Sequence, residues 1–358
     1  MIITEVGLKG FRNLSETVFE PHEEINIFYG ENAQGKTNIA EAIWLFSGMK
    51  SFRGAKDNEL IAYGGNSAKI YINYLNSIRE NKAEINITNK RNAVLNGVKL
   101  QSAVSLIGKF SAVVFSPSFL SVVESGPAER RKFIDTAICQ IKPSYAAVLA
   151  EYSKLLKQRN SLLKDVAFES SLLDILDVID EKMSVCGEKM VQERKDYLSL
   201  CLPIAKEIFL GLSSGKEEID LIYKSSCENG VSLKDAFKNN RKNDIIYKVT
   251  SAGPHRDDID ILLNDFFVKS FGSQGQKRSC AVALKLTEAQ ILGNITGEQP
   301  VIILDDVMSE LDSGRQDFIL NHIKNRQVFI TCCDPAPVFS ASGGKKFEIV
   351  NGNIEKCI

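Results

Sequence analysis

Short runs of apolar residues alternating with polar ones dominate the first 115 positions of the chain. Runs of this kind, separated by turn residues, predict β-strands. One helical pattern interrupts them: it begins at Gly35 and places Ile39, Ile43 and Phe46 on one face. The predicted strands and hairpins lie at residues 1–11, 25–30, 68–75, 83–89, 93–100 and 110–116.

The pattern changes between Pro127 and about Leu212, where apolar residues recur at helical spacing and β-branched runs are almost absent. This segment predicts an insertion of antiparallel helices. The periodicity is too interrupted for a long coiled coil.

A strand pattern returns after Glu217, with predicted strands at residues 219–225 and 244–253. A helix is then expected from Gln274 to Gly293, followed by a strand at 301–306, a further helix and a strand at 327–333. The chain closes with a hairpin over residues 347–358, because an Asn-Gly pair separates two short apolar runs.

Composition limits the possible classes of protein. A chain of 358 residues exceeds the usual size of a single core, so we expect two domains or one domain with an insertion. With a formal net charge of -1, any nucleic-acid surface must be a local basic patch. No stretch approaches the roughly 20 apolar residues of a membrane helix, and no signal-peptide pattern is visible, which predicts a cytoplasmic protein without membrane contact.

The eight cysteines lack metal-ligand spacing, and the only close pair is the adjacent Cys332 and Cys333. We expect reduced thiols, most of them buried.

One loop carries a specific chemical prediction. The sequence GENAQGKT at residues 30–37 follows a predicted strand and opens a predicted helix, which is the context of a phosphate-binding P-loop. Backbone N–H groups and the positive helix N-terminus would face phosphate oxygens. Lys36 would reach the β- and γ-phosphates, and the Thr37 hydroxyl would bind Mg²⁺. The expected nucleotide-binding residues of this segment are Gly30, Glu31, Asn32, Ala33, Gln34, Gly35, Lys36, Thr37 and Asn38.

A second carboxylate-bearing strand supports this interpretation. Residues Val301–Leu304 are continuously apolar, as a strand buried on both faces must be. Asp305 then stands at the carboxyl end of the strand, where ligands bind in open α/β sheets. We expect Asp305 to hold Mg²⁺ and Asp306 to orient the attacking water, which makes Asp306 a catalytic candidate beside Lys36.

Two further stretches resemble parts of ABC-type ATPases. The sequence SQGQ at residues 273–276 opens a predicted helix and resembles the signature motif, and SELD at residues 309–312 resembles the D-loop. The order of loop, helical insertion, signature, carboxylate strand and D-loop resembles the SMC-like branch. The resemblance implies nucleotide contacts from Ser273, Gln274, Gly275, Gln276 and Asp312, with Ser273 as a third catalytic candidate.

An ordered set of motifs along nearly the whole chain resembles the bacterial RecF family. The motifs are KGFRN at 9–13, GENAQGKTN at 30–38, FSPSFL at 115–120, GPAERRKFID at 126–135, KLLKQRN at 154–160, GPHRDD at 253–258, SQGQKR at 273–278 and DDVMSELD at 305–312.

This resemblance implies an α/β fold: an ABC-type P-loop ATPase head, with a mixed β-sheet and flanking helices, carrying an inserted helical arm. Residues 1–120 and 216–358 would form the head and residues 121–215 the arm. The family implies an ATP-dependent homodimer with Mg-ATP between protomers. It also implies DNA binding at a duplex or a single-strand/duplex junction, and action with RecR and RecO to place RecA recombinase on gapped DNA.

Two positions depart from most ABC ATPases. Asp306 replaces a glutamate and is one methylene shorter, and Thr331 stands where a switch histidine is usual. Both departures predict slow ATP turnover, with ATP mainly holding a conformation.

Basic residues suggest where DNA would bind. Adjacent cations at Arg130, Arg131 and Lys132 could form a stripe with Lys154, Lys157, Arg159 and Lys164, and a second candidate group follows the P-loop helix at Lys50, Arg53 and Lys56. Charge runs are usually solvated faces, so both interpretations stay open. His255 and Arg256 could approach the nucleotide or a partner subunit, or could merely be hydrogen-bonded within their turn.

A P-loop ATPase sequence is also compatible with two functions other than a DNA-binding switch. A transporter ATPase does not fit, because its loop and signature lie about a hundred residues apart and it normally carries the switch histidine. A scaffold that binds ATP without hydrolysing it keeps the same fold, and the sequence does not exclude it.

Overall fold

The computed structural model describes residues 1–166, 169, 171–227, 230–333 and 344–357. It divides into two compact units, the first formed by residues 1–119 and 282–358 and the second by residues 120–281. The first unit is therefore built from both ends of the chain, with the second inserted between them.

A six-stranded sheet forms the centre of the first unit, with the order β15-β14-β3-β13-β12-β8. The strands from β14 to β8 are mutually parallel, and only β15 pairs antiparallel with β14. Helix α1 packs against β13, β12 and β8. The bounds of these elements are β3 Ile25–Tyr29, α1 Lys36–Leu45, β8 Ala112–Phe115, β12 Val301–Asp305, β13 Val328–Cys332, β14 Lys345–Val350 and β15 Asn353–Cys357.

The central strands β12 and β13 are buried at every position, which explains why their sequences are continuously apolar up to the final residues. Stacked aromatic rings fill the adjoining core: Phe28 lies 4.9 Å from Phe347 and 6.2 Å from Phe329 between ring centroids. The predicted strand at 301–306 and the predicted closing hairpin are both present, and the hairpin turns at Asn351 and Gly352 with positive φ at both residues.

An antiparallel sheet completes the first unit, with the order β2-β1-β4-β5-β6-β7. Strands β4 and β5 alternate buried and solvated side chains, which is the pattern of a sheet with one face on the core. The remaining elements of this unit are β1 Ile2–Lys9, β2 Thr17–Phe19, β4 Ala68–Leu75, β5 Glu80–Ile87, β6 Arg91–Leu95, β7 Val98–Lys99 and α9 Ser313–His322.

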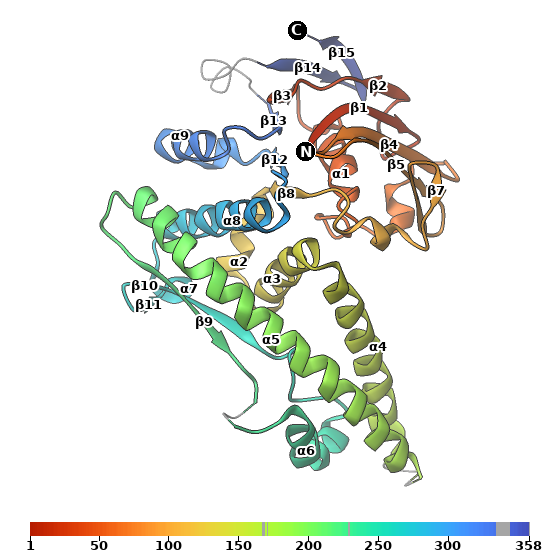
Figure 1. Ribbon diagram of the computed structural model, residues 1–358, viewed down its shortest axis with the longest axis vertical. Helices are drawn as coiled ribbons and strands as arrows, with labels where there is room; N and C mark the ends of the chain where they lie inside the picture. The colour runs from red at the N-terminus through yellow and green to blue at the C-terminus, as the bar shows by residue number, and fades with distance from the viewer. Residues whose placement is uncertain (167–168, 170, 228–229, 334–343, 358) are drawn as a thin grey trace. The chain divides into compact units, whose positions relative to one another are not determined.

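Long helices dominate the second unit, and α4 and α5 lie side by side as an antiparallel pair (Figure 1). The predicted helical insertion over residues 127–212 is thus present. A three-stranded antiparallel sheet, β11-β10-β9, packs on α5 and α3. The elements are α2 Ser121–Glu124, α3 Pro127–Ile141, α4 Pro143–Asp165, α5 Leu172–Leu212, β9 Ile219–Lys224, α6 Leu233–Tyr247, β10 Asp258–Leu263, β11 Phe266–Phe267 and α7 Val268–Phe271.

Helix α8, Gln274–Thr296, begins in the second unit and continues in the first.

The second unit continues to residue 281, beyond the predicted end of the arm at residue 215, because β9 and β10 pack against α5 and α3. One expectation about this region was wrong. The predicted strand at 244–253 is instead the end of α6 and the loop after it. Ser232 caps that helix by accepting the N–H of Asp235, and Asp244 faces the unit's interior.

Among the described residues, no helix is long and apolar enough to cross a membrane. All eight cysteines are free thiols; four are buried, two are half-buried, and Cys333 and Cys357 are exposed.

Candidate nucleotide site

The loop between β3 and α1 depends on two glycines with positive φ. Gly30 has φ 146°, and a Cβ atom there would lie 2.4 Å from the carbonyl oxygen of Ile349. Gly35 has φ 114°, and a Cβ atom there would lie 2.7 Å from a methyl group of Leu14. Both the backbone conformation and the close approach therefore require glycine.

Lys36 is the first residue of α1 and is buried, although it carries an ammonium group. Its Nζ donates to the loop carbonyls of Gly30 at 2.6 Å and Glu31 at 2.7 Å. The Sγ of Cys333, the residue after β13, lies 3.6 Å from the same nitrogen. The loop thus folds around the ammonium group and holds it at the N-terminus of α1.

Asp305, at the carboxyl end of β12, lies close enough to the Thr37 hydroxyl for the hydroxyl to lower its pKa. Thr331 on the neighbouring strand β13 donates its hydroxyl to Asp305 Oδ1 at 2.8 Å. The side chain is buried, and this desolvation raises the pKa of Asp305 while the two hydroxyl groups oppose the shift. Two parallel strands and the P-loop helix therefore bring a hydroxyl and a carboxylate together.

Asp306 follows with φ 52°, so its backbone departs sharply from the strand direction. Its N–H donates to Thr331, both to the hydroxyl at 3.0 Å and to the carbonyl at 3.2 Å. Desolvation raises the pKa of its carboxyl, and Lys36 partly counteracts this. In the sequence, Thr331 stood out only because it occupies the position of the usual switch histidine. In the structure, it is hydrogen-bonded to both Asp305 and Asp306.

A cavity of about 300 Å³ joins these groups to the P-loop. Residues 32–38 of the predicted phosphate-binding loop line it, together with Arg53, a cation that the sequence analysis had assigned to DNA. The lining residues are Asn32, Ala33, Gln34, Gly35, Lys36, Thr37, Asn38, Arg53 and Asp306.

A second cavity of about 650 Å³ shares Asn38 and Arg53 with the first. Arg12 and the fully exposed ring of Tyr63 also line it. The sequence reasoning missed this region. The KGFRN motif contained Arg12 and Asn13, but only the fold brings the end of β1 beside the loop after α1.

The predicted signature segment forms a capping box at the start of α8. Gln276 N donates to Ser273 Oγ at 3.2 Å, and Ser273 N donates to Gln276 Oε1 at 2.6 Å. The Gln276 side chain also donates to Glu217. Ser273 and Gln274 are exposed and Gly275 is half-buried, so the first turn of the helix is accessible from solvent.

Asp312 has a local structural role that the sequence did not predict. Its side chain accepts the Arg315 N–H at 3.0 Å and caps α9, and it also pairs with the Arg315 guanidinium. The backbone hydrogen bond is the largest contribution to its lowered pKa. Asp312 does not line the cavity at the P-loop.

Arg159 was predicted as a DNA contact, and the structure contradicts this. It is fully buried and donates to Asp180 and to Asp244, each at 2.6 Å, while its guanidinium lies 5.1 Å from the centre of the Phe237 ring. The reason is helical spacing, because residues 152, 155, 159 and 163 all lie on the buried stripe of α4. The lysines at 154, 157 and 164 are exposed.

The three adjacent cations on α3 differ in their exposure to solvent. Arg130 is buried and forms a bidentate pair with Asp258, so its assignment to DNA is wrong as well. Arg131 is half-buried and donates to the carbonyl of Asp257 at 2.6 Å; desolvation lowers its pKa. Lys132 is exposed and lies 3.8 Å from Glu129. Lys56, in the first unit, is exposed.

His255 is enclosed rather than presented to a ligand. Its Nε2 lies 3.1 Å from the carbonyl oxygen of Thr250, and its Nδ1 lies 2.8 Å from the hydroxyl of Tyr152. A carbonyl only accepts, so the proton is on Nε2 and Nδ1 accepts from Tyr152. The geometry therefore fits a histidine that is hydrogen-bonded within the protein, and not one that is presented to the nucleotide or to a partner subunit.

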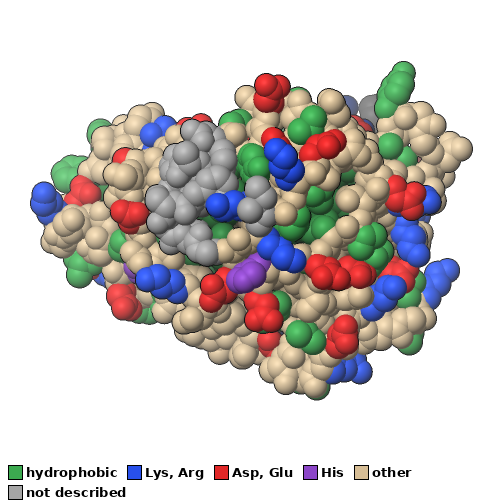
Figure 2. All heavy atoms as spheres, turned by 90° about the horizontal axis from the view of Figure 1, so that it is seen from above, with side chains coloured by type: hydrophobic (Ala, Val, Ile, Leu, Met, Phe, Trp, Pro, Cys, Tyr) green, Lys and Arg blue, Asp and Glu red, His purple; other side chains and the backbone are tan. Residues whose placement is uncertain are grey.

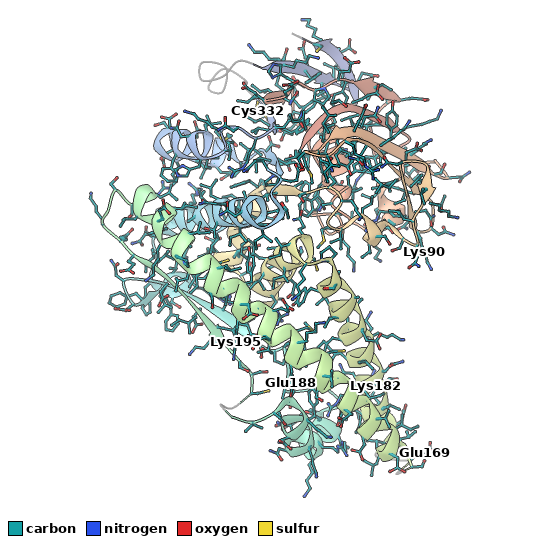
Figure 3. The ribbon with its side chains drawn as sticks, in the orientation of Figure 1. Lys90, Glu169, Lys182, Glu188, Lys195 and Cys332 are labelled. Atoms are coloured by element: carbon teal, nitrogen blue, oxygen red, sulfur yellow. The ribbon has the colours of Figure 1, made fainter. Side chains whose placement is uncertain are left out.

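Charges of both signs are mixed on the visible surfaces. Lysine and arginine side chains lie among aspartate and glutamate on the face in Figure 2. Figure 3 labels Lys182, Glu188 and Lys195 along α5, where all three are exposed. On the face in Figure 2, lysine and arginine side chains thus form small groups rather than one continuous basic patch.

Comparison with known proteins places this site in a family. A family model described as "RecF/RecN/SMC N terminal domain" matches residues 2–346. The DNA replication and repair protein RecF of Acetivibrio thermocellus is 40% identical over 345 residues, covering 93% of this chain and 94% of its own. The protein of the same name from Clostridium perfringens is 36% identical over 363 residues, covering 99% and 100%.

Solved structures agree with this placement. The structure described as "Structure of the recombination mediator protein RecF-ATP in RecFOR pathway" is 36% identical, covers 99% of this chain and 97% of its own, and has a TM-score of 0.91. An Smc head domain from Pyrococcus furiosus has a TM-score of 0.57 at 18% identity over 100% of this chain and 96% of its own, which shows a shared ABC-type head fold. The chain belongs to the RecF/RecN/SMC N-terminal domain family and, within it, to the RecF proteins.

Proposed function

We propose that this chain is an ATP-dependent DNA-binding protein of recombinational repair, in which slow ATP hydrolysis acts as a switch. One observation carries the proposal. A single cavity is lined by the P-loop backbone, Lys36, Arg53 and Asp306, and the Thr37–Asp305 pair adjoins it. Relatives described as DNA replication and repair proteins, and a recombination mediator protein solved with ATP, supply the cellular context.

The triphosphate would occupy the smaller cavity. Lys36 now donates to two loop carbonyls, and phosphate oxygens would be stronger, charged acceptors for the same ammonium protons. The nucleoside would extend into the neighbouring cavity, where the exposed ring of Tyr63 offers a surface for stacking. Asn38 and Arg53 border both cavities and would lie where the phosphates join the nucleoside.

The residues present fit a magnesium ion. Thr37 and Asp305 bring one hydroxyl and one carboxylate together, and hard oxygen ligands of this kind suit Mg²⁺. Within the described residues, no group of three or more His, Cys, Asp or Glu side chains could hold a metal, which agrees with an ion completed by phosphate and water oxygens. Bound Mg²⁺ would neutralise charge on the β- and γ-phosphates.

Asp306 would act on the attacking water. Water attacks the γ-phosphorus, the bond to the bridging oxygen breaks, and ADP and inorganic phosphate result. The raised pKa of Asp306 makes its carboxylate a better proton acceptor than an exposed aspartate. Because aspartate is one methylene shorter than glutamate and Thr331 replaces the switch histidine, we expect slow turnover.

The signature segment would complete the site in a homodimer. The N-terminal turn of α8 is accessible at Ser273 and Gln274, and the positive end of the helix dipole favours an anion there. By resemblance to ABC ATPases, this turn would face the γ-phosphate bound by the partner protomer. Two equivalent sites then form across a two-fold axis.

DNA would bind through exposed lysines. Lys56, Lys132, Lys154 and Lys157 are exposed, whereas Arg130 and Arg159 are buried in ion pairs. Since the net charge is only -1, affinity should depend steeply on salt and should rise when ATP brings two protomers together. We infer RecR and RecO as partners because the solved relatives are described in the RecFOR pathway. Placement of RecA at gapped DNA is inferred from the family resemblance alone.

A non-hydrolysing scaffold is the second candidate, and Thr331 in place of a histidine favours it. Steady-state ATP turnover, measured with and without duplex DNA, separates the two. The switch predicts slow turnover that DNA accelerates and that Lys36→Ala abolishes. Absence of turnover under both conditions, with ATP still bound, would support the scaffold instead.

A further inference from the structure

A buried carboxylate lies on α1, the helix that follows the P-loop. Glu41, on α1, is 0% exposed. Arg12 binds it with two guanidinium nitrogens, at 3.0 Å to Oε2 and 3.1 Å to Oε1. Arg53 NH1 lies 3.9 Å from Oε2. One anion thus faces two cations, and both cations line the larger cavity.

The segment that carries Arg53 is anchored on the same carboxylate. Ser51 donates its hydroxyl to Glu41 and accepts the N–H groups of Arg53 at 3.1 Å and Ala55 at 3.2 Å. We call residues 51–55 the arginine loop. Ser51 is buried, whereas the side chain of Arg53 remains 45% exposed. The base of the loop is therefore fixed, and its guanidinium stays accessible.

A polar chain aligns the guanidinium with the P-loop. Arg53 NH1 donates to Asn38 Oδ1 at 2.8 Å, and Asn38 donates to Asn13 at 2.6 Å. Asn13 in turn donates to the carbonyl of Ala33, within the P-loop, at 3.1 Å. The backbone of Arg53 is therefore held by Ser51 within the arginine loop, and its guanidinium is held by Asn38.

We propose that Glu41 is a positioning residue that fixes Arg53, through Ser51 and the arginine loop, to receive the nucleotide's phosphates. This rests on the proposed function of the cavity. The long 3.9 Å separation leaves Arg53 without a tight ion pair, so a phosphate does not have to displace one. The bidentate pair with Arg12 compensates the burial of Glu41 in the core.

Preorganisation gives this arrangement its effect on affinity. A guanidinium on a free loop would lose side-chain and loop entropy when it binds phosphate, whereas an anchored one has already lost much of that freedom. Glu41→Gln keeps the size of the side chain but places an amide nitrogen where the carboxylate accepted hydrogen bonds. Ser51→Ala releases the arginine loop while it leaves the Arg12–Glu41 pair intact.

The test is a double-mutant cycle on equilibrium ATP binding. Glu41→Gln, Ser51→Ala and Arg53→Ala should each weaken ATP binding about tenfold, which is about 1.4 kcal/mol. The double variant Ser51→Ala/Arg53→Ala should bind no more weakly than Arg53→Ala, since the anchor acts only through Arg53. Glu16→Gln is the matched control, because Glu16 pairs with Lys9 at the surface.

Several outcomes would overturn the inference. ATP affinity unchanged by Ser51→Ala, or losses that simply add in the double variant, would show that Ser51 does not act through Arg53. Circular dichroism monitors folding, and if Glu41→Gln fails to fold, Ser51→Ala decides alone. Lys36→Ala is measured beside them. Normal ATP affinity of that variant would refute the proposed nucleotide site. If Lys36→Ala loses ATP binding but the Glu41, Ser51 and Arg53 variants keep it, only the positioning role of Glu41 is refuted.

Discussion

Replacement of His255 by glutamine should make the stability of the second unit less sensitive to acid. Burial is the largest cause of the depressed pKa of His255, which lies at about 4 instead of 6.5. The cations of Arg256 and Arg131 lower it further, while the Thr250 carbonyl and Asp257 act in the opposite direction. Glutamine can still donate toward Thr250 but carries no proton-binding group in this range.

The magnitude follows from linkage between protonation and folding. Between pH 6.5 and about 4 the unfolded chain binds a proton that the folded chain excludes, so stability falls as the pH falls through this window. The difference between the two pKa values corresponds to about 3 kcal/mol in full. Between pH 7 and pH 5 alone, the wild-type chain should lose about 2 kcal/mol through this residue.

Urea denaturation at pH 7 and pH 5, followed by circular dichroism, measures the effect. Comparing wild type with His255→Gln cancels the carboxylates that titrate in both proteins, and the transition of the second unit is the relevant one. His322→Gln, at an exposed position on α9, controls for removal of a histidine. Equal losses of stability in wild type and His255→Gln would refute the assignment of His255 as a buried, neutral side chain.

Four further predictions concern the nucleotide site and the arm. Lys36→Ala should abolish tight Mg-ATP binding, measured with a fluorescent ATP analogue; unchanged affinity would contradict the P-loop assignment. Asp306→Asn should bind ATP normally but hydrolyse it at least about tenfold more slowly, and loss of both would contradict the division of roles. Lys36→Ala and Ser273→Arg proteins should each be inactive, yet their mixture should regain some ATP-dependent dimer by ultracentrifugation, because one site per mixed dimer is intact; a fully active Ser273→Arg protein would exclude the shared site. Arg159→Ala should lower the free energy of unfolding by about 3–5 kcal/mol in urea, against about 0.5 kcal/mol or less for Lys154→Ala, and similar effects would show that the buried ion pairs are not decisive.

Local patterns were enough for the elements whose structure depends on nearby residues. The P-loop followed from glycine spacing, because Gly30 and Gly35 need conformations that other residues avoid. Strand β12 followed from continuous apolarity, since a strand buried on both faces has no polar positions. The prediction of a strand at residues 244–253 was wrong because an adjacent pair of isoleucines suits a strand as well as a helix. The cap at Ser232 and the buried Asp244 belong to a helix that begins outside that segment.

The family could be identified from an ordered set of motifs, and the glycine loop and the carboxylate strand from short contiguous segments. Which cations stay accessible depends instead on contacts between residues far apart in the chain. The sequence does not distinguish Arg53 from Arg130 and Arg159. In the structure, Arg53 lines the cavity at the P-loop, whereas Arg130 pairs with Asp258 and Arg159 pairs with Asp180 and Asp244. The physical reason is that a guanidinium can be buried only with an anion, and the partners of Arg130 and Arg159 lie up to 128 positions away in the chain.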